Sequence, residues 1–303
     1  MQPDWLDKVE YPFTSRYWQV QGNKMHYIDE GKGDTILFIH GTPSWSFDFR
    51  KVFASLSLQY RCIAIDLIGF GLSDKPSEYD YSTQHHSETL EKFVIAQNLK
   101  DLTLVAHDFG VSIGMSMAFN HPDRIRQFVI LNSWLWSAEE NPEYIRLRKI
   151  LKNLLLPFFY KYFNFSPRFV LPSTFGDNKL SKALKRQYVK PFHKISERKA
   201  PLAFVKSLLN DQSWFESLWI NRNNINSQPT LFMWGMKDPI IGPHYLEKFM
   251  SGFPNNKVVK IPTAGHFPQE EQPAIVTEAI QVFMKKWSLS KVPLNSQVDK
   301  ANK

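Results

Sequence analysis

The chain has 303 residues, of which 43% are hydrophobic, and a formal net charge of +8. This length and composition exclude a largely disordered chain and are typical of one large domain, or of a core with an inserted lobe. Cys62 is the only cysteine, which excludes a framework of intrachain disulfides. The first eleven residues are acidic and lack an apolar segment, and no run of about 18 apolar residues follows. We therefore expect neither a signal peptide nor a membrane span, but a soluble cytoplasmic protein.

Strand and helix patterns alternate along the first 133 residues. Residues 16–20 and 24–30 alternate between apolar and polar side chains and are predicted to form an antiparallel pair. Continuous apolar runs predict buried strands over 35–40, 60–66, 102–105 and 125–131. Helices are predicted between them, over 46–58, 83–98 and 109–120. This alternation is typical of a parallel sheet that is covered by helices on both faces.

From residue 134 to residue 221 the pattern changes to amphipathic helices and prolines, without a convincing strand. Strands are again predicted over 230–234 and 257–261, and helices over 244–250 and 274–288. We therefore predict an α/β fold with a mostly parallel sheet and an inserted helical cap. Its parts are a core of residues 1–133 and 222–290, a cap of residues 134–221 and a flexible tail of residues 291–303. An insertion at this point is expected to cover the carboxyl ends of the strands, where such sheets bind ligands.

The positive charge of the chain is concentrated in the predicted cap. Residues 141–200 contain 14 Lys and Arg against 3 Asp and Glu, and they include the apolar and aromatic run at 154–163. A basic, aromatic segment can dock on an anionic membrane or bind nucleic acid. We expect instead a helical lobe whose apolar face covers a pocket and whose Lys-rich face is solvated. The basic residues are spaced through helical periodicity, and no nucleic-acid motif accompanies them.

The turn after the 102–105 strand carries the clearest catalytic signal. Asp108 lies at the apex of this strand-to-helix turn, with Ala106 two residues before it and Gly110 two residues after it. This is the spacing of the nucleophile elbow of α/β-hydrolases, where strand and helix nearly touch and the nucleophile has a strained backbone. A carboxylate at the apex can attack saturated carbon and leave an alkyl-enzyme ester, whereas a serine attacks acyl carbon. The alternative interpretation is an Asp that only caps the helix.

Polar residues at three further strand ends favour the catalytic interpretation. After the 35–40 strand, Gly41 allows a close approach, and the amides of Thr42 and Phe109 are predicted to form an oxyanion hole. Asp238 follows the 230–234 strand, and His266 follows the 257–261 strand. Nucleophile, acid and histidine thus occur in the chain order of an α/β-hydrolase triad. Each residue alone has an ordinary structural explanation, but together they predict an enzyme.

Three core motifs carry a resemblance to a known family: HGTPSWSF at 40–47, DLIGFGLSDKP at 66–76 and HDFG at 107–110. They resemble haloalkane dehalogenases and, more distantly, epoxide hydrolases of the same fold. The resemblance extends from about residue 3 to residue 287. It implies Asp108 as nucleophile, His266 as base and Asp238 as its orienting acid, with no metal and no organic cofactor. The family's other acid position, after the sixth strand, is Asn132-Ser133 here and carries no carboxylate.

The resemblance implies hydrolysis of a carbon–halogen bond, with a small apolar substrate and water as the partners. Asp108 would displace halide, and His266 would activate the water that hydrolyses the ester. The family usually binds halide through a Trp after the nucleophile and an Asn after the His-Gly pair, where this chain has Phe109 and Thr42. Four tryptophans are candidates for the missing halide or substrate contacts: Trp45, Trp134, Trp136 and Trp214.

Three alternatives to a dehalogenase remain open. Epoxide hydrolases protonate the opening ring with cap tyrosines, and the predicted cap contains Tyr144, Tyr160, Tyr162 and Tyr188. Their usual aromatic residue after the His-Gly pair is absent. A relative that opens β-lactones with loss of carbon dioxide also uses the Asp, although its elbow usually carries Trp. A non-catalytic ligand-binding protein on this fold is the third alternative, and the acid–histidine pair argues against it.

Overall fold

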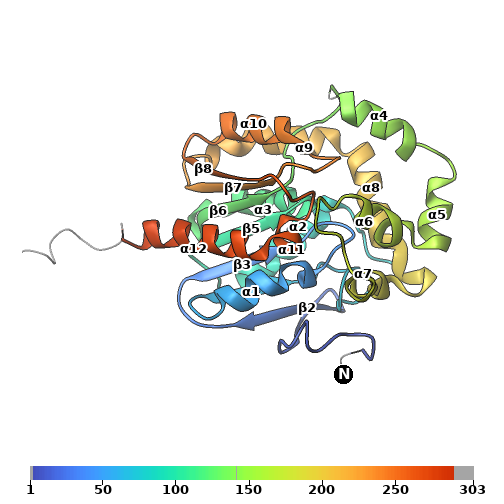
Figure 1. Ribbon diagram of the computed structural model, residues 1–303, viewed down its shortest axis with the longest axis horizontal. Helices are drawn as coiled ribbons and strands as arrows, with labels where there is room; N and C mark the ends of the chain where they lie inside the picture. Colours follow the sequence, from blue (N-terminus) through green and yellow to red (C-terminus); the bar gives the residue numbers. More distant parts are fainter. Residues whose placement is uncertain (1–2, 141, 290–303) are drawn as a thin grey trace, which may run out of the picture.

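The computed structural model describes residues 3–140 and 142–289. The described residues form an eight-stranded sheet in the order β1-β2-β4-β3-β5-β6-β7-β8, flanked by helices (Figure 1). β1 (Arg16–Val20) pairs antiparallel with β2 (Asn23–Glu30), which pairs antiparallel with β4. The remaining pairs are parallel, among β3 (Thr35–Ile39), β4 (Arg61–Ile65), β5 (Leu102–His107), β6 (Ile125–Leu131), β7 (Thr230–Gly235) and β8 (Asn256–Ile261). This confirms the predicted α/β fold with a mostly parallel sheet.

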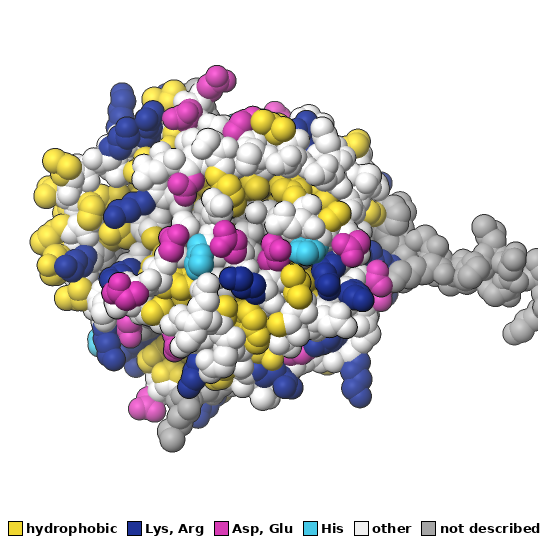
Figure 2. All heavy atoms as spheres, turned by 180° about the vertical axis from the view of Figure 1, so that it is seen from behind, with side chains coloured by type: hydrophobic (Ala, Val, Ile, Leu, Met, Phe, Trp, Pro, Cys, Tyr) yellow, Lys and Arg dark blue, Asp and Glu magenta, His cyan; other side chains and the backbone are white. Residues whose placement is uncertain are grey.

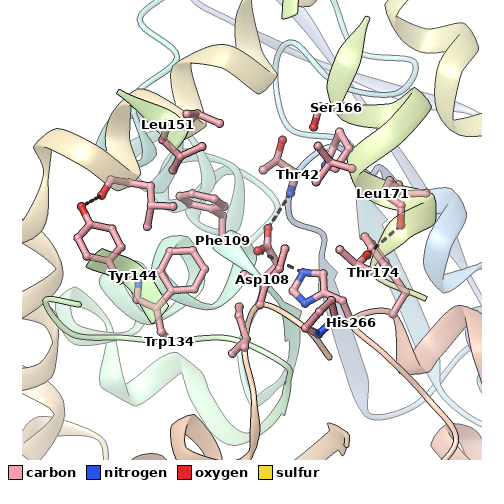
Figure 3. Close-up of a pocket in the computed structure, with 18 of the residues that line it drawn as sticks. Thr42, Asp108, Phe109, Trp134, Tyr144, Leu151, Ser166, Leu171, Thr174 and His266 are labelled. Carbon is pink, nitrogen blue, oxygen red and sulfur yellow. Dashed lines mark hydrogen bonds and ion pairs between the residues drawn. The ribbon is translucent and has the colours of Figure 1, made fainter. Parts of the chain in front are cut away.

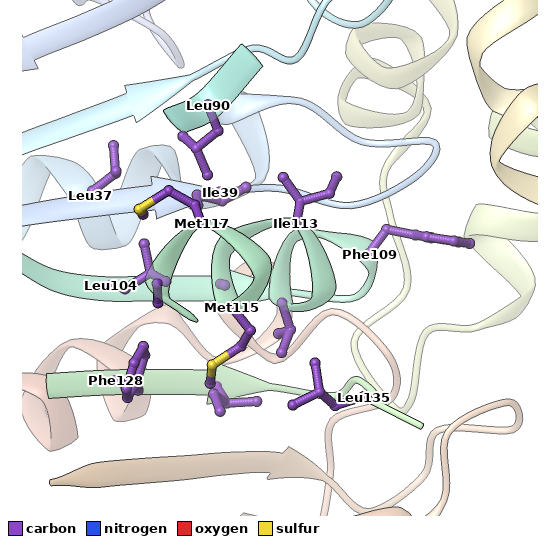
Figure 4. Close-up of a cluster of buried hydrophobic side chains, with 14 of the residues drawn as sticks. Leu37, Ile39, Leu90, Leu104, Phe109, Ile113, Met115, Met117, Phe128 and Leu135 are labelled. Carbon is purple, nitrogen blue, oxygen red and sulfur yellow. The ribbon is translucent and has the colours of Figure 1, made fainter. Parts of the chain in front are cut away.

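The sheet separates two hydrophobic cores, because successive side chains of a strand point to opposite faces. Leu37 belongs to one core and Phe38 to the other, and both are fully buried. Figure 4 shows the first core, in which Leu37 and Leu104 of the strands face Ile113 and Met117 of α3. The helices that cover the two cores include α2 (Thr83–Ala96) and α3 (Phe109–Asn120) on the first face, and α1 (Arg50–Leu56) and α12 (Pro273–Leu289) on the second.

The described chain between β6 and β7 forms helices and no strand, as the sequence predicts. Figure 1 shows most of these helices gathered at one end of the sheet, opposite the C-terminal end of α12. They are α4 (Pro142–Leu151), α5 (Leu156–Phe163), α6 (Leu171–Ser173), α7 (Lys182–Val189), α8 (Lys199–Asn210) and α9 (Gln212–Asn221). After β7 follow α10 (Pro243–Gly252) and α11 (Pro268–Glu271). No helix within the described ranges is both long and apolar enough to cross a bilayer.

Two elements near the strand ends differ from the sequence prediction. The helix predicted over 46–58 begins as a 3₁₀ helix, Ser46–Phe49, and α1 follows it only to Leu56. The amide of Ser46 donates to Asp66 Oδ1 at 2.8 Å, which ties this first turn to the loop after β4. β5 continues two residues beyond its predicted end and brings the chain directly to Asp108.

Candidate active site

The turn at Asp108 has the geometry of the predicted elbow. Asp108 joins β5 to α3 with φ of 53° and ψ of −131°, a left-handed conformation that is strained for a residue with a side chain. A Cβ atom on Gly110 would lie 2.3 Å from the Ile39 carbonyl oxygen, and one on Gly41 would lie 2.1 Å from Asp108 Oδ1. Larger residues at either position would therefore push strand, helix and carboxylate apart.

The two carboxylate oxygens of Asp108 have different surroundings (Figure 3). Oδ1 accepts a hydrogen bond of 2.8 Å from the amide of Thr42, and Oδ2 lies 3.5 Å from Nε2 of His266. Ser133 Oγ donates to the Asp108 carbonyl oxygen at 2.6 Å and fixes the backbone of the turn. Phe109 follows as the first residue of α3. One oxygen is thus held by the protein, while the other remains on the side of the histidine.

Asp238 and His266 form a buried pair through the ring nitrogen of His266 that does not face Asp108. His266 Nδ1 lies 2.7 Å from Asp238 Oδ2, and Oδ1 of the same carboxylate accepts from the amides of Ile240 and Ile241 at 2.8 and 3.0 Å. Burial alone would raise the pKa of Asp238, but the charge of His266 and these donors hold it below its ordinary value. The carboxylate therefore stays charged and fixes the tautomer and orientation of the ring.

The two carboxylates that flank His266 determine its charge. Burial alone would lower the pKa of the imidazole, but Asp238 and Asp108 stabilise the imidazolium and raise the pKa above its ordinary value. His266 is 4% exposed, so solvent screens these charges little. The site at rest therefore consists of an imidazolium between two carboxylates.

Sequence reasoning missed the residue that supports Asp238. Asn132, directly after β6, donates from Nδ2 to Asp238 Oδ2 at 2.9 Å, and its Oδ1 accepts from the amide of Gly235 at 2.8 Å. The same side chain thus links β6 to the end of β7 and satisfies the carboxylate. Its position after the sixth strand, where the family has its other acid, was the signal that could have identified it.

His107, next to Asp108, is fully buried and supports His266 through the backbone. Its Nε2 lies 2.7 Å from the carbonyl oxygen of His266 and donates to it. Burial lowers the pKa of His107 to about 3, so its ring is neutral. The side chain packs beneath the site, as the alternation of side chains along β5 predicts.

A cavity of about 200 Å³ opens above Asp108 and His266 (Figure 3). Its floor contains Thr42, Asp108, Phe109 and His266, which follow three different strand ends. Its walls are mainly apolar and come from the helical segment after β6 and from the loop after β7; they include Leu151, Tyr160, Val170, Leu171, Val205, Leu208, Pro239, Ile240 and Ile241. The helices of the predicted cap thus lie over the carboxyl ends of the strands.

Of the four candidate tryptophans, Trp134 is the one that lines this cavity. Trp45 is fully buried elsewhere, and its Nε1 donates to the Gln187 carbonyl oxygen at 3.1 Å. Trp136 stacks on Tyr245 and meets Phe249, and Trp214 packs against Phe215. The structure therefore places three of the four away from the cavity. Packing against other aromatic side chains accounts for their positions.

The four candidate tyrosines also separate into two groups. Tyr144 and Tyr160 line the cavity, whereas Tyr162 is half exposed on the surface and Tyr188 hydrogen-bonds Glu270. The hydroxyl of Tyr144 donates to the Leu208 carbonyl oxygen at 2.9 Å, so its proton is already used. Burial raises the pKa of Tyr160 to about 12. Two of the four candidate tyrosines thus lie at the cavity that contains Asp108, and the hydroxyl of one of them is already hydrogen-bonded to the backbone.

Two buried polar groups of the cavity lining have no hydrogen-bond partner. They are Oγ1 of Thr42 and Nε1 of Trp134. A buried donor without a partner costs about 1–3 kcal/mol, and a bound polar group can recover that energy. Both groups can donate a hydrogen bond to a ligand in the cavity.

Comparisons with known proteins show the family to which this fold belongs. Residues 34–273 match a family model described as alpha/beta hydrolase fold. The chain is 32% identical to a cis-3-alkyl-4-alkyloxetan-2-one decarboxylase of Shewanella oneidensis, over 90% of this chain and 89% of that protein. It is 30% identical to haloalkane dehalogenase 2 of Mycobacterium tuberculosis, over 90% and 96%. The crystal structure of a haloalkane dehalogenase from Agrobacterium tumefaciens C58 superposes with a TM-score of 0.83 at 25% identity, covering 93% of this chain and 99% of that one.

Proposed function

Since this chain belongs to the alpha/beta hydrolase fold family and to its haloalkane dehalogenase-like group, we propose that it hydrolyses a carbon–halogen bond through an ester on Asp108. The observation that carries the proposal is the unequal pair of carboxylate oxygens beneath an apolar cavity. Oδ1 is held by the Thr42 amide, and Oδ2 faces the space above His266. A carboxylate fixed in this way can attack a saturated carbon in line with its leaving group.

In the first step, Asp108 Oδ2 forms a bond to the substrate carbon while the carbon–halogen bond breaks. The halide leaves with the bonding electron pair, and Asp108 becomes an alkyl ester. Oδ1 is then the ester carbonyl oxygen, already hydrogen-bonded to the Thr42 amide. Two residues of the cavity with unpartnered donors, Thr42 and Trp134, are positioned to stabilise the departing halide.

The second step depends on the charge that the first step removes. Esterification neutralises Asp108, so one of the two carboxylates that hold the proton on His266 is lost and the pKa of His266 falls. The neutral imidazole, oriented by Asp238, can then take a proton from water that attacks Cγ of Asp108. The Thr42 and Phe109 amides would bind the resulting oxyanion. Collapse releases the alcohol and restores the carboxylate.

The cavity walls indicate the class of substrate. The walls are mainly aliphatic and aromatic, and the cavity volume of about 200 Å³ suits a small apolar molecule. We propose that residues 134–221 act as the cap, because Leu151, Tyr160 and Val205 from this segment close the cavity over Asp108. An apolar cover of this kind excludes water from the charged groups before the ester has formed.

Trapping of the ester tests the proposal directly. A His266→Ala variant incubated with 1-bromobutane should gain the mass of a butyl group on the peptide that contains Asp108, because the ester forms but is not hydrolysed. An Asp108→Asn variant under the same conditions is the matched control and should gain nothing. The proposal is wrong if the His266→Ala variant keeps its mass while bromide remains bound to carbon.

A second candidate reaction is the opening of a β-lactone with loss of carbon dioxide. The observation that favours it is the 32% identity to the cis-3-alkyl-4-alkyloxetan-2-one decarboxylase of Shewanella oneidensis, which extends over 90% of this chain. In a β-lactone the leaving oxygen stays tethered to the substrate as a carboxylate. Attack of Asp108 at the saturated ring carbon would give an ester, and loss of carbon dioxide would expel the Asp108 carboxylate and leave an alkene. A His266→Ala variant would then release alkene from a β-lactone without water, whereas 1-bromobutane would leave no adduct.

A further inference from the structure

The exposed hydrophobic side chains of the protein are concentrated around α5. Ten of the 18 large hydrophobic residues that are exposed within the described ranges lie between Ile145 and Ile195. We call seven of them the aromatic patch: Leu154, Leu155, Phe158, Phe159, Tyr162, Phe163 and Phe169. Figure 2 shows hydrophobic and basic side chains gathered at this end of the molecule. Clusters of this size on a surface mark an interaction site, whereas single exposed hydrophobic residues do not.

The aromatic patch is continuous. The rings of Phe158 and Tyr162 lie 4.9 Å apart, and those of Phe159 and Phe163 lie 5.7 Å apart. Phe165, which is half-buried, extends the row to Phe169 at 5.5 Å. Leu154 precedes the helix with 94% of its surface exposed. The rings thus pack on one another and leave a broad apolar face in contact with solvent.

This face contradicts the expectation of a solvated, Lys-rich outer surface at α5. The inner side of the helix is apolar as predicted, because Leu156 and Tyr160 are buried and Tyr160 lines the cavity. The outer side, however, carries Phe158, Phe159 and Phe163 rather than charges. A helix that is apolar on all sides is normally surrounded by other apolar groups. The outer side of α5 therefore lacks the partner that its composition requires.

The charges around the patch identify the partner. From residue 144 to residue 176 the chain has six Lys and Arg and no Asp or Glu. Lys152 and Lys161 are exposed beside the patch, with Lys161 Nζ 5.3 Å from the centre of the Tyr162 ring. Arg198 donates to the carbonyl oxygens of Lys161 and Tyr162 at 2.7 and 3.1 Å and adds positive charge at the end of the helix. Aromatic side chains flanked by cations match the interface of an anionic bilayer.

We propose that the aromatic patch docks the protein on an anionic lipid bilayer. α5 then lies in the headgroup region, with its phenylalanines inserted among the acyl chains and its lysines among the headgroups. An acidic protein surface would match the cations but would not cover seven large hydrophobic side chains. A nucleic acid would likewise leave the leucines and phenylalanines in water.

Docking in this orientation places the cavity next to the lipid. Leu151, Tyr160 and Val170 line the cavity from the same stretch of chain whose outer side forms the patch. An apolar substrate dissolved in the bilayer would then be separated from the cavity by about one helix diameter, or roughly 10 Å. This delivery rests on the proposed function, whereas docking itself does not.

Vesicle sedimentation tests the docking without any turnover. The wild-type protein should sediment with vesicles of equal parts phosphatidylcholine and phosphatidylglycerol, and at least tenfold less with phosphatidylcholine alone. A triple variant, Leu154→Ser, Phe158→Ser and Phe163→Ser, should bind the mixed vesicles at least tenfold more weakly. The matched control replaces exposed hydrophobic residues elsewhere, Leu58→Ser and Val282→Ser, and should bind as the wild type does. All replaced side chains are exposed, so the melting temperatures should stay close together.

Two further measurements distinguish docking on lipid from contact between copies of this chain. Lys152→Gln with Lys161→Gln should weaken binding to the mixed vesicles and reduce its sensitivity to salt. Equal binding of the wild type and the triple variant would overturn the proposal. The proposal would also be overturned if the wild type bound no vesicles and the triple variant had a lower molar mass than the wild type, measured by light scattering. The patch would then join copies of this chain. Ester formation on His266→Ala in vesicle-free buffer tests the hydrolase separately.

Discussion

In the proposed reaction, Thr42 is the residue on which the departure of a halide is expected to depend most. Phe109 lines the same cavity, but its ring packs edge-on against Trp134 at 4.8 Å and has no N–H to donate. The Thr42 amide already holds Asp108, while its hydroxyl is buried without a partner. One residue thus offers two donors with different targets: the amide donates to Asp108, and in the proposed reaction the hydroxyl donates to the leaving group.

Replacement of Thr42 by Val should separate these two roles. Val has nearly the same shape and keeps the amide, so Asp108 stays in place while the hydroxyl is lost. A lost hydrogen bond to a charged group costs about 1.5–3 kcal/mol, which corresponds to a loss of roughly ten- to a hundredfold in the rate of ester formation. Thr42→Ser should retain most of the rate. Single-turnover measurements with alkyl bromides would contradict the role of the hydroxyl if Val and Ser variants reacted equally fast.

The Asp238–His266 pair makes stability depend on pH in a defined direction. The pKa of His266 is raised on folding. The contribution of His266 to the free energy of unfolding is therefore complete below about pH 6.5 and is lost as pH rises through the raised pKa. The pKa of Asp238 is lowered, so its contribution is present above about pH 3.9 and is lost as pH falls. The pair therefore stabilises the fold most between about pH 4 and pH 6.5.

Urea unfolding of the wild type and Asp238→Asn at pH 5.5, 7.5 and 9 measures this contribution. The difference in free energy of unfolding between the two proteins should be largest at pH 5.5. It should decrease above that pH by at most about 1.4 kcal/mol per pH unit. If the difference in free energy of unfolding stays constant from pH 5.5 to pH 9, Asp238 does not stabilise the charged form of His266 in the folded protein.

At the scale of elements, Asn132 couples two neighbouring strands, β6 and β7, at their carboxyl ends. Its side chain bonds the amide and carbonyl of Gly235 as well as Asp238 Oδ2. Asn132→Ala should leave the buried Gly235 amide unpaired and remove a donor from Asp238, at a cost of about 1–3 kcal/mol in the free energy of unfolding. The rate of ester hydrolysis should fall more than the rate of ester formation, because the orientation of His266 matters mainly in the second step. Equal losses in both single-turnover rates would contradict this coupling.

The helices and strands were largely predictable from the sequence, whereas the side-chain contacts between them were not. β5 is buried along its whole length, so its apolar run and the small residues around Asp108 predicted both strand and elbow. The contact of Asn132 with Asp238 joins residues 106 positions apart, and no local pattern encodes it. The exposure of the outer side of α5 was also not predicted, because an apolar run in the sequence does not indicate which side of the helix is covered by other residues.

At the scale of the whole molecule, a buried ion pair and a hydrogen bond to it tie the segment proposed as the cap to the core. Glu270 in α11 accepts from Arg50 Nη2 at 2.9 Å, and its other oxygen accepts from the hydroxyl of Tyr188 in α7. Arg50 Nε also donates to Glu10 of the N-terminal segment at 2.8 Å. Four segments that are distant in sequence thus meet around the pair of Arg50 and Glu270, and Glu270 lies four residues after His266.

Glu270→Gln should therefore destabilise the whole fold rather than one helix. The variant leaves the guanidinium of Arg50, which is 1% exposed, with only the partly exposed Glu10 as counter-charge. Removal of one partner from a buried pair costs about 3–5 kcal/mol. The matched control is Asp177→Asn in the pair with Lys237, where both side chains are 50% exposed and the expected cost is about 0–1 kcal/mol. Urea unfolding compares the two variants, and similar losses would mean that the cap segment is held by its apolar contacts instead of this pair.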